Sequence, residues 1–281
     1  MGVYTVARDD FVNARRSSVV LAVVGTFAVL VAMVFGAEMD IYPDAYRTLW
    51  DVSALIAFAF PIFVAPLTYL AIAGERESGT IKFSLGLPNT RGEYFLAKYA
   101  SRVSVAVATV VVSTAVGFVV ALATYENGAD PVRFATFAAV SALFAAAIAG
   151  TFLALSATTA SRSRAMFAVI GTYFVMLPFW FGIIPFVNLG NLLDTLSSVP
   201  GVSLSESTRD LIGTLSPVQA YFSSTEFVYR GVLDEYGVFE QIRSQPDTLA
   251  FDPWFAIAVL VGWAVVPTVL SFLWFRRSEL G

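Results

Sequence analysis

The chain has 281 residues, of which 57% are apolar and 14% are charged, and its formal net charge is −4. Soluble domains are roughly 45–50% apolar and about 25% charged, so this composition excludes an ordinary soluble domain and predicts an all-α integral membrane protein of the cell membrane. Cysteine and histidine are both absent, which excludes disulfides and thiolate metal sites and removes the commonest metal ligand and general base. We expect no catalytic residue, no metal and no nucleic-acid partner. The acidic balance, with Lys82 and Lys98 as the two lysines, favours a high-salt organism.

Six apolar segments of about 20 residues or more lack Asp, Glu, Lys, Arg, Asn and Gln, and each is long enough to cross a bilayer as a helix. The six predicted spans are 17–36, 52–73, 103–124, 134–158, 165–187 and 254–275. Five prolines lie within them and predict kinks: Pro61, Pro66, Pro178, Pro185 and Pro267.

The distribution of cations predicts the orientation. With both termini and the even-numbered connections in the cytoplasm, that side carries 12 of the 17 Lys and Arg and 6 of the 21 Asp and Glu. The cytoplasmic side then has a net charge of +6 and the outer side −10, which together give the total of −4. We therefore expect both the N-terminus and the C-terminus in the cytoplasm.

The connections predict the organisation of a single transmembrane domain over residues 1–281. Residues 1–16 place Val3, Ala7 and Phe11 at helical spacing, which indicates an amphipathic interfacial helix, with a frayed terminus as the alternative. Residues 74–101 form a polar inner loop, and residues 188–253 form a long outer loop. In the outer loop, Pro and Gly breaks favour short helices, for example at 206–215 behind Ser205 or Ser203 as the cap.

The fourth span carries small residues at helical spacing, which permit helices to approach closely. They are Ala142, Ala146, Gly150 and Ala154, beside Ser141, Ala145 and Ala149. We interpret this stripe as intramolecular packing in the first place, with a dimer or pathway seam as the alternative.

The sequence lacks the motifs of several energy-using proteins. No Gly-x-x-x-x-Gly-Lys-Ser/Thr phosphate loop is present, so the chain has no such ATP site. Ion-coupled transporters usually place an ionisable group inside a span, and these spans have none. These absences favour a protein that transports or binds something and receives its energy from another protein.

The inner loop carries the most specific pattern. Glu75, Arg76 and Glu77 stand where the second span ends, and Glu75 is placed to pair with Arg76, Arg91 or Lys98. Gly79 permits a turn, and Thr90 with Glu93 forms a capping box for a helix that runs into the third span. The apolar residues before Pro88, which are Ile81, Phe83, Leu85 and Leu87, indicate an exposed docking element, or alternatively an interfacial helix packed on its own bundle.

The order Glu-Arg-Glu-x-Gly-Thr, a short apolar run, Leu-Pro, then Arg and a later Lys resembles the permease subunit of type 2 ATP-binding-cassette (ABC) exporters. The predicted topology is similar over the whole chain. The residues that match by position are Glu75, Gly79, Thr80, Pro88, Arg91 and Lys98, whereas Ala97 stands where the family often has Gly. The outer segment 216–221, Ser-Pro-Val-Gln-Ala-Tyr, is also similar to the family, especially to the permease group of nitrous-oxide reductase maturation.

The resemblance implies a transmembrane subunit that forms a translocation pathway in the lipid bilayer as a dimer with a second permease copy or a homologue. It implies no directly bound cofactor, because ATP is bound and hydrolysed on a separate ABC ATPase subunit. The residues implied for the ATPase-coupling loop are Glu75, Arg76, Glu77, Gly79, Thr80, Ile81, Phe83, Leu85, Leu87, Pro88, Arg91 and Lys98. From the residues alone, a secondary transporter or channel and a non-transporting scaffold or assembly factor stay open.

Overall fold

The computed structural model of the chain describes residues 17–82 and 90–277. Throughout these residues every regular element is a helix, which confirms the predicted all-α class. The predicted interfacial helix at 1–16 lies outside the described residues.

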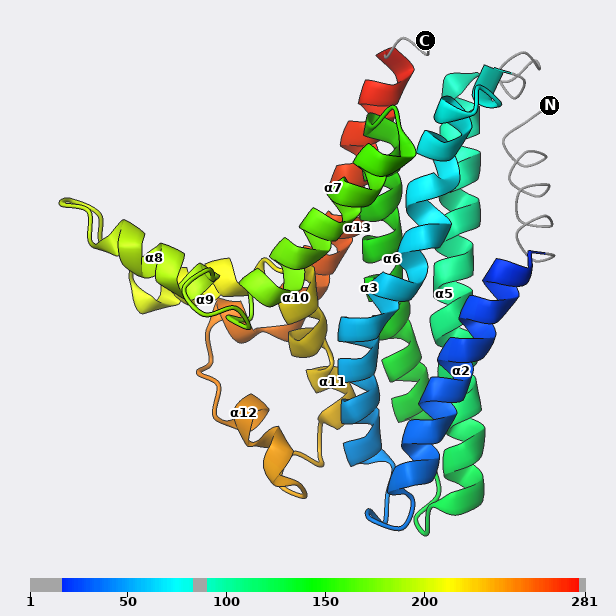
Figure 1. The fold of residues 1–281 in the computed structure, drawn as a ribbon. Coiled ribbons are helices and arrows are strands. Elements are labelled where there is room, and N and C mark those ends of the chain that lie inside the picture. Colours follow the sequence, from blue (N-terminus) through cyan, green and yellow to red (C-terminus); the bar gives the residue numbers. More distant parts are fainter. Residues whose placement is uncertain (1–16, 83–89, 278–281) are drawn as a thin grey trace.

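Five long helices match five of the six predicted spans and are long and apolar enough to cross a membrane. They are α2 (Ser18–Glu38), α3 (Tyr46–Glu77), α5 (Arg91–Thr124), α6 (Pro131–Thr158) and α13 (Pro253–Arg277). Figure 1 shows them side by side as a bundle. The 34 residues of α5 rise about 51 Å at 1.5 Å per residue, so this helix extends beyond a hydrocarbon core of roughly 30 Å.

The predicted span at 165–187 is not one continuous helix. Its first part is α7 (Arg162–Phe174), which continues as the π-helix η1 (Val175–Phe179), after which the chain turns. The reason is Pro178, which has no N–H for the helical ladder and crowds the preceding turn. Gly182 and Phe186 then adopt positive φ angles of 67°, which end any regular helix. The prediction of a continuous helix through residue 187 is therefore wrong after Phe179.

Helix α6 lies at the centre of the bundle and contacts α3, α5 and α13. A Cβ atom added at Gly150 would stand 3.2 Å from Thr268 Oγ1 of α13 and 3.2 Å from a ring carbon of Tyr99 of α5. The absence of a side chain at Gly150 thus permits these two helices to approach α6. At this position the small-residue stripe packs within the chain, as its first interpretation predicts.

The outer segment folds into short helices between η1 and α13. They are α8 (Leu189–Ser197), α9 (Glu206–Thr214), α10 (Pro217–Ser224), α11 (Glu226–Tyr229), the 3₁₀-helix η2 (Gly237–Phe239), α12 (Glu240–Arg243) and the 3₁₀-helix η3 (Leu249–Phe251). The predicted helix at 206–215 is confirmed as α9, and Ser205 caps it by accepting a hydrogen bond from the Thr208 N–H at 3.2 Å. Helices α8 and α9 project to one side of the bundle (Figure 1).

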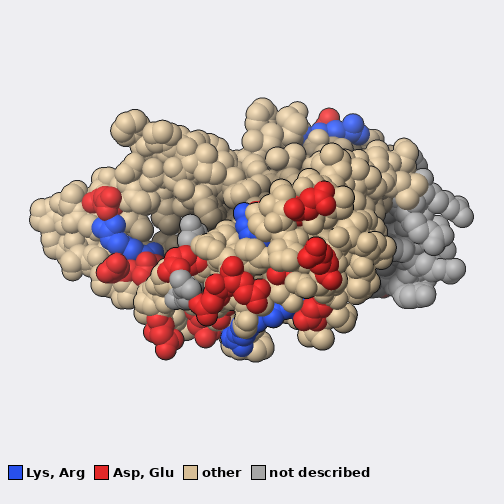
Figure 2. Space-filling view, turned by 90° about the horizontal axis from the view of Figure 1, so that it is seen from below, with Lys and Arg blue, Asp and Glu red and all other residues tan. Residues whose placement is uncertain are grey.

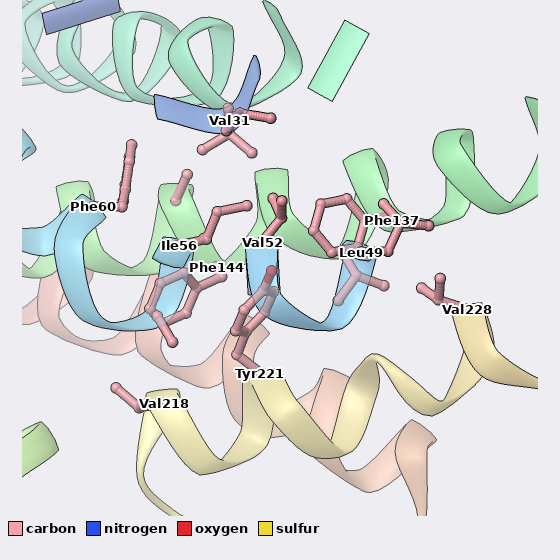
Figure 3. Close-up of a cluster of buried hydrophobic side chains, with 14 of the residues drawn as sticks. Val31, Leu49, Val52, Ile56, Phe60, Phe137, Phe144, Val218, Tyr221 and Val228 are labelled. Carbon is pink, nitrogen blue, oxygen red and sulfur yellow. The ribbon is translucent and has the colours of Figure 1, made fainter. Parts of the chain in front are cut away.

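Helix α10 packs into the bundle rather than lying apart from it. Figure 3 shows Tyr221 of α10 beside Phe144 of α6, and the two rings stack with centroids 4.6 Å apart. Val218 and Tyr221 are buried in the same hydrophobic cluster as Val52 of α3. The outer segment is therefore part of the main core.

The two ends of the bundle differ in charge. The α2–α3 and α5–α6 connections lie at the lower end in Figure 1, whereas the α6–α7 connection and the last turn of α13 lie at the upper end. Figure 2 views the lower end and shows Asp and Glu gathered there with fewer Lys and Arg. This segregation agrees with the charge distribution from which the orientation is predicted.

Candidate functional site at the end of α3

Helix α3 ends in a tight turn at Gly79, as the sequence predicts. Gly79 has a φ angle of +74°, a conformation that glycine adopts without a Cβ penalty, and its N–H donates to the Arg76 carbonyl at 3.1 Å. The Thr80 hydroxyl donates to the Glu75 carbonyl at 3.4 Å and lies 2.9 Å from the Ser78 hydroxyl. These bonds satisfy carbonyl groups that a helix end leaves unpaired and fix the start of the connection to α5.

Glu75 connects this helix end to α5. The Lys98 ammonium donates to Glu75 Oε1 at 2.7 Å, and the Tyr94 hydroxyl donates to Glu75 Oε2 at 2.6 Å. Of the three cations that the sequence offers, Lys98 is thus the partner. Lys98 is only 7% exposed, so its side of the pair is enclosed by protein. Tyr94 is missed by sequence reasoning, although it lies one helical turn before Lys98 on the same face of α5.

Arg76 and Glu77 reach two further helices. Arg76 Nη1 donates to the carbonyl of Ala157 at 3.0 Å and to that of Thr159 at 3.2 Å, at the end of α6. Glu77 Oε2 accepts from the backbone N–H of Arg162 at 2.5 Å, at the first residue of α7. A cation at a helix C-terminus and an anion at a helix N-terminus both complement the helix dipole. Three consecutive residues therefore fix α3 to three different helices.

An apolar cluster packs beneath these polar contacts. Ile81 is 2% exposed and lies in a cluster with Ile72, Phe95 and Phe275. The expectation that Ile81 is exposed for docking is therefore wrong, because its side chain finds apolar partners within the bundle, as the alternative of a locally packed segment predicts. The Tyr94 ring stacks on Phe275 of α13 with centroids 5.9 Å apart, so the cluster also includes the last helix.

The remaining predicted residues divide into two groups. Phe83, Leu85, Leu87 and Pro88 lie outside the described residues. Arg91 begins α5, and the predicted capping box is confirmed: the Glu93 N–H donates to Thr90 Oγ1 at 3.2 Å and the Thr90 N–H donates to Glu93 Oε2 at 2.7 Å. Among the described residues, no group of three or more His, Cys, Asp or Glu is placed to hold a metal.

Ser156 of α6 is a contact that sequence reasoning misses. Its buried hydroxyl donates to the Tyr69 carbonyl at 2.7 Å and accepts from the N–H groups of Ile72 at 3.1 Å and Ala73 at 3.0 Å. A side chain from α6 thus enters the backbone ladder of α3 just before Glu75. A single serine in an apolar span gives little sequence signal, because most such residues bond to their own helix.

The outer motif at 216–221 has a structural role. Ser216 Oγ caps α10 and donates to the Met176 carbonyl of η1 at 2.9 Å. The Tyr221 hydroxyl lies 2.8 Å from Ser141 Oγ in α6, and burial raises the pKa of Tyr221, so the phenol stays neutral. The motif joins η1, α10 and α6.

Comparison with known proteins shows which family this chain is similar to. A family model described as ABC-2 family transporter protein matches residues 4–280. The chain is also 27% identical over 180 residues to the probable ABC transporter permease protein NosY of Pseudomonas aeruginosa, a match that covers 61% of this chain and just under two thirds, 66%, of that relative. Because the family match extends over almost all of its length, the chain belongs to the ABC-2 transporter family and is a membrane subunit of an ABC transporter.

Proposed function

We propose that the chain is the permease of an ABC exporter and that it receives mechanical work from a separate ATPase subunit through the 78–90 connection. The observation that carries this proposal is the trio of contacts from Glu75, Arg76 and Glu77 to α5, α6 and α7. A displacement of the connection acts on these helices together rather than on one loop. The family membership supports the presence of an ATPase partner.

Coupling needs two conformations that the partner distinguishes, because a ligand shifts an equilibrium only by its differential affinity for the two states. The contacts at the end of α3 suit such a change. They are charge-assisted bonds near the end of the bundle, and water reaches them through the Glu75 side chain, which is 28% exposed. The apolar cluster of Ile81 and Phe275, in contrast, holds the helices together. We propose that ATP-driven movement of the connection changes the angle between α3 and its three neighbours.

We further propose six crossings, with α7 and η1 as a shortened fifth one, both termini in the cytoplasm, and a dimer of this chain or of this chain and a homologue as the pathway. The excess of cations at the end of the bundle that carries the 78–90 connection supports this orientation. Cysteine labelling is a direct test, because the chain contains no cysteine. Ser163 and Ser207 are both exposed; an impermeant reagent added outside should label Ser207→Cys and spare Ser163→Cys. The reverse pattern would overturn the orientation.

Docking of the ATPase is tested by the paired change Phe83→Asp and Leu85→Asp. If these side chains are buried against the partner, their loss should weaken the complex about tenfold or more, since burial of each large apolar side chain contributes about 1.5–3 kcal/mol. Co-purification of the two subunits measures the effect. Val132→Asp is the control, because Val132 is 71% exposed and belongs to the first turn of α6, a helix that starts at the opposite end of the bundle (Figure 1). An intact complex in the double variant would refute docking at this segment.

A further inference from the structure

A hollow opens between α3, α10 and the segment that follows η1. Four aromatic rings form its walls: Trp50, Phe58, Phe181 and Phe222. Phe222 stands between the others, with its ring centroid 5.8 Å from Trp50, 6.0 Å from Phe58 and 6.1 Å from Phe181. The hollow has a volume of about 190 Å³, which is enough for one small ring and too small for a drug-sized ligand.

The polar groups in this hollow lack partners. Ser223 is 8% exposed, and its hydroxyl oxygen is buried without a hydrogen-bond partner. Within the described part of the chain, the side-chain amides of Gln219 and Gln245, which also line the hollow, form no hydrogen bond either. The neighbouring Ser224 differs, because its hydroxyl donates to the Tyr221 carbonyl at 2.7 Å. An unpaired buried hydroxyl costs about 1–3 kcal/mol, so a ligand that pairs with the Ser223 hydroxyl would recover this free energy.

The chemistry of the lining selects the kind of ligand. Among the side chains that the structure describes, those that line the hollow are aromatic, aliphatic, hydroxyl or amide and none is ionisable, so a charged ligand would lose its hydration without a countercharge from them. A purely apolar ligand would leave Ser223, Gln219 and Gln245 unpaired. Hydroxyl groups both donate and accept hydrogen bonds, and so do the side-chain amides of Gln219 and Gln245. A ligand with hydroxyl groups can therefore pair with both. The ring walls, in turn, suit an apolar C–H face.

We propose that this hollow binds an uncharged hydroxyl-bearing ring of the size of a single sugar unit. The rings of Trp50 and Phe222 contact its apolar face, and Ser223, Gln219 and Gln245 bind its hydroxyl groups. The motif of residues 216–221 contributes Gln219 to this site. Val218 and Tyr221 of the same motif are buried in the core instead. Trp50 and Phe58 lie in the first half of α3, so binding in the hollow does not depend on coupling at the other end of this helix.

The test uses the full chain in phosphatidylcholine nanodiscs, which avoids detergents with sugar head groups. The soluble probes are the methyl glycosides of glucose, galactose and mannose, observed by saturation-transfer NMR and by the shift of the thermal unfolding midpoint. Glucosamine and glucuronate are the charged counterparts. We expect saturable binding of at least one neutral glycoside and at least tenfold weaker binding of the charged sugars.

Two variants locate the binding. Ser223→Ala should lose the transfer signal and the ligand-induced midpoint shift, whereas its midpoint without ligand should be equal to or above that of the wild type, because the unpaired hydroxyl is gone. Ser224→Ala, in the adjacent buried position, should bind as the wild type does. Gln219→Leu is a second variant at the lining and should weaken binding even if Ser223→Ala folds poorly.

A second arm distinguishes a free sugar from a lipid head group. In nanodiscs that contain glucosyl diacylglycerol, the unfolding midpoint should rise and the soluble glycoside should be displaced if a glycolipid is the natural source. Binding of the soluble glycosides without this competition supports a free sugar, and either result supports the site. The absence of binding in both arms, or equal binding by the wild type and both lining variants, would overturn the proposal.

Discussion

The two halves of the bundle are held together by different chemistry. At the end of α3, charged side chains bind neighbouring helices, as in the pair of Glu75 with Lys98 and the bonds from Arg76 to the end of α6. In the half around α10, neutral groups and stacked rings join α10 to α6, as in the contact of Tyr221 with Phe144 and Ser141. The contrast separates a region whose contacts water can replace from a region that is fixed by packing.

This difference bears on how motion passes through the bundle. Charge-assisted bonds are individually strong but have an alternative partner in water at the membrane boundary, so they suit a joint that changes between two arrangements. Close-packed aromatic rings resist small displacements. We therefore expect mutations in the half around α10 to act mainly on the stability of the fold. Mutations at the end of α3 should act mainly on coupling to the ATPase.

The largest effect on stability is expected for Tyr221→Ala. The side chain is fully buried, and deletion of a buried aromatic side chain destabilises proteins by about 3–5 kcal/mol. Tyr221→Phe keeps the stacking and loses the hydrogen bond to Ser141, for which we expect about 1 kcal/mol. Thermal unfolding in nanodiscs measures both. A similar loss in the two variants would show that the hydrogen bond, not the packing, holds α10.

A smaller effect is expected for Arg76→Ala. The change leaves the carbonyls of Ala157 and Thr159 without the guanidinium, and bonds to charged groups contribute about 1.5–3 kcal/mol each in favourable settings, with the lower figure expected near water. Arg76→Lys keeps the charge and one donor and should recover part of the loss. Unfolding of the two variants, compared with the wild type, provides the measurement. Equal stability of Arg76→Ala and the wild type would contradict a link between α3 and α6 at this site.

The smallest effect on stability is expected for Ser156→Ala. The N–H groups of Ile72 and Ala73 can return to bonds within α3, so we expect a loss of about 1 kcal/mol together with reduced ATPase activity of the assembled complex. Ser113→Ala is the matched control, because the buried Ser113 hydroxyl donates to Thr109 in its own helix at 2.7 Å. A larger effect on ATPase turnover in Ser113→Ala than in Ser156→Ala would contradict a role for Ser156 in coupling.

Much of the fold is readable from the sequence because the bilayer imposes length and composition on each spanning helix. The exception, 165–187, is apolar throughout, and the turn after Phe179 depends on Pro178 and on two residues with positive φ. Hydropathy carries no information about backbone geometry. The sequence predicts a kink at Pro178, but the end of the helix at Phe179 needs the structure.

The candidate site was predictable in part. The sequence identifies Glu75 as a pairing residue, but the choice of Lys98 depends on the approach of α5, 23 positions along the chain. The capping box at Thr90 and the turn at Gly79 are local features and are confirmed. The burial of Ile81 and the three bonds of Ser156 arise from tertiary packing, which short motifs do not encode.

The most direct test of the coupling proposal is the ATPase activity of the assembled complex with Glu75→Gln. The amide retains an oxygen that can accept from Tyr94 or Lys98 but removes the charge, so assembly should be retained while turnover falls. Glu93→Gln is the control: it removes a charge at the same end of the bundle and keeps the cap at Thr90, since Gln also serves in a capping box. Co-purification and ATPase rate are measured on the same samples, together with Lys98→Gln and the double variant, whose combined effect should be less than the sum of the two. Our account predicts normal assembly with impaired turnover for Glu75→Gln and normal turnover for Glu93→Gln; unchanged turnover in Glu75→Gln would contradict it.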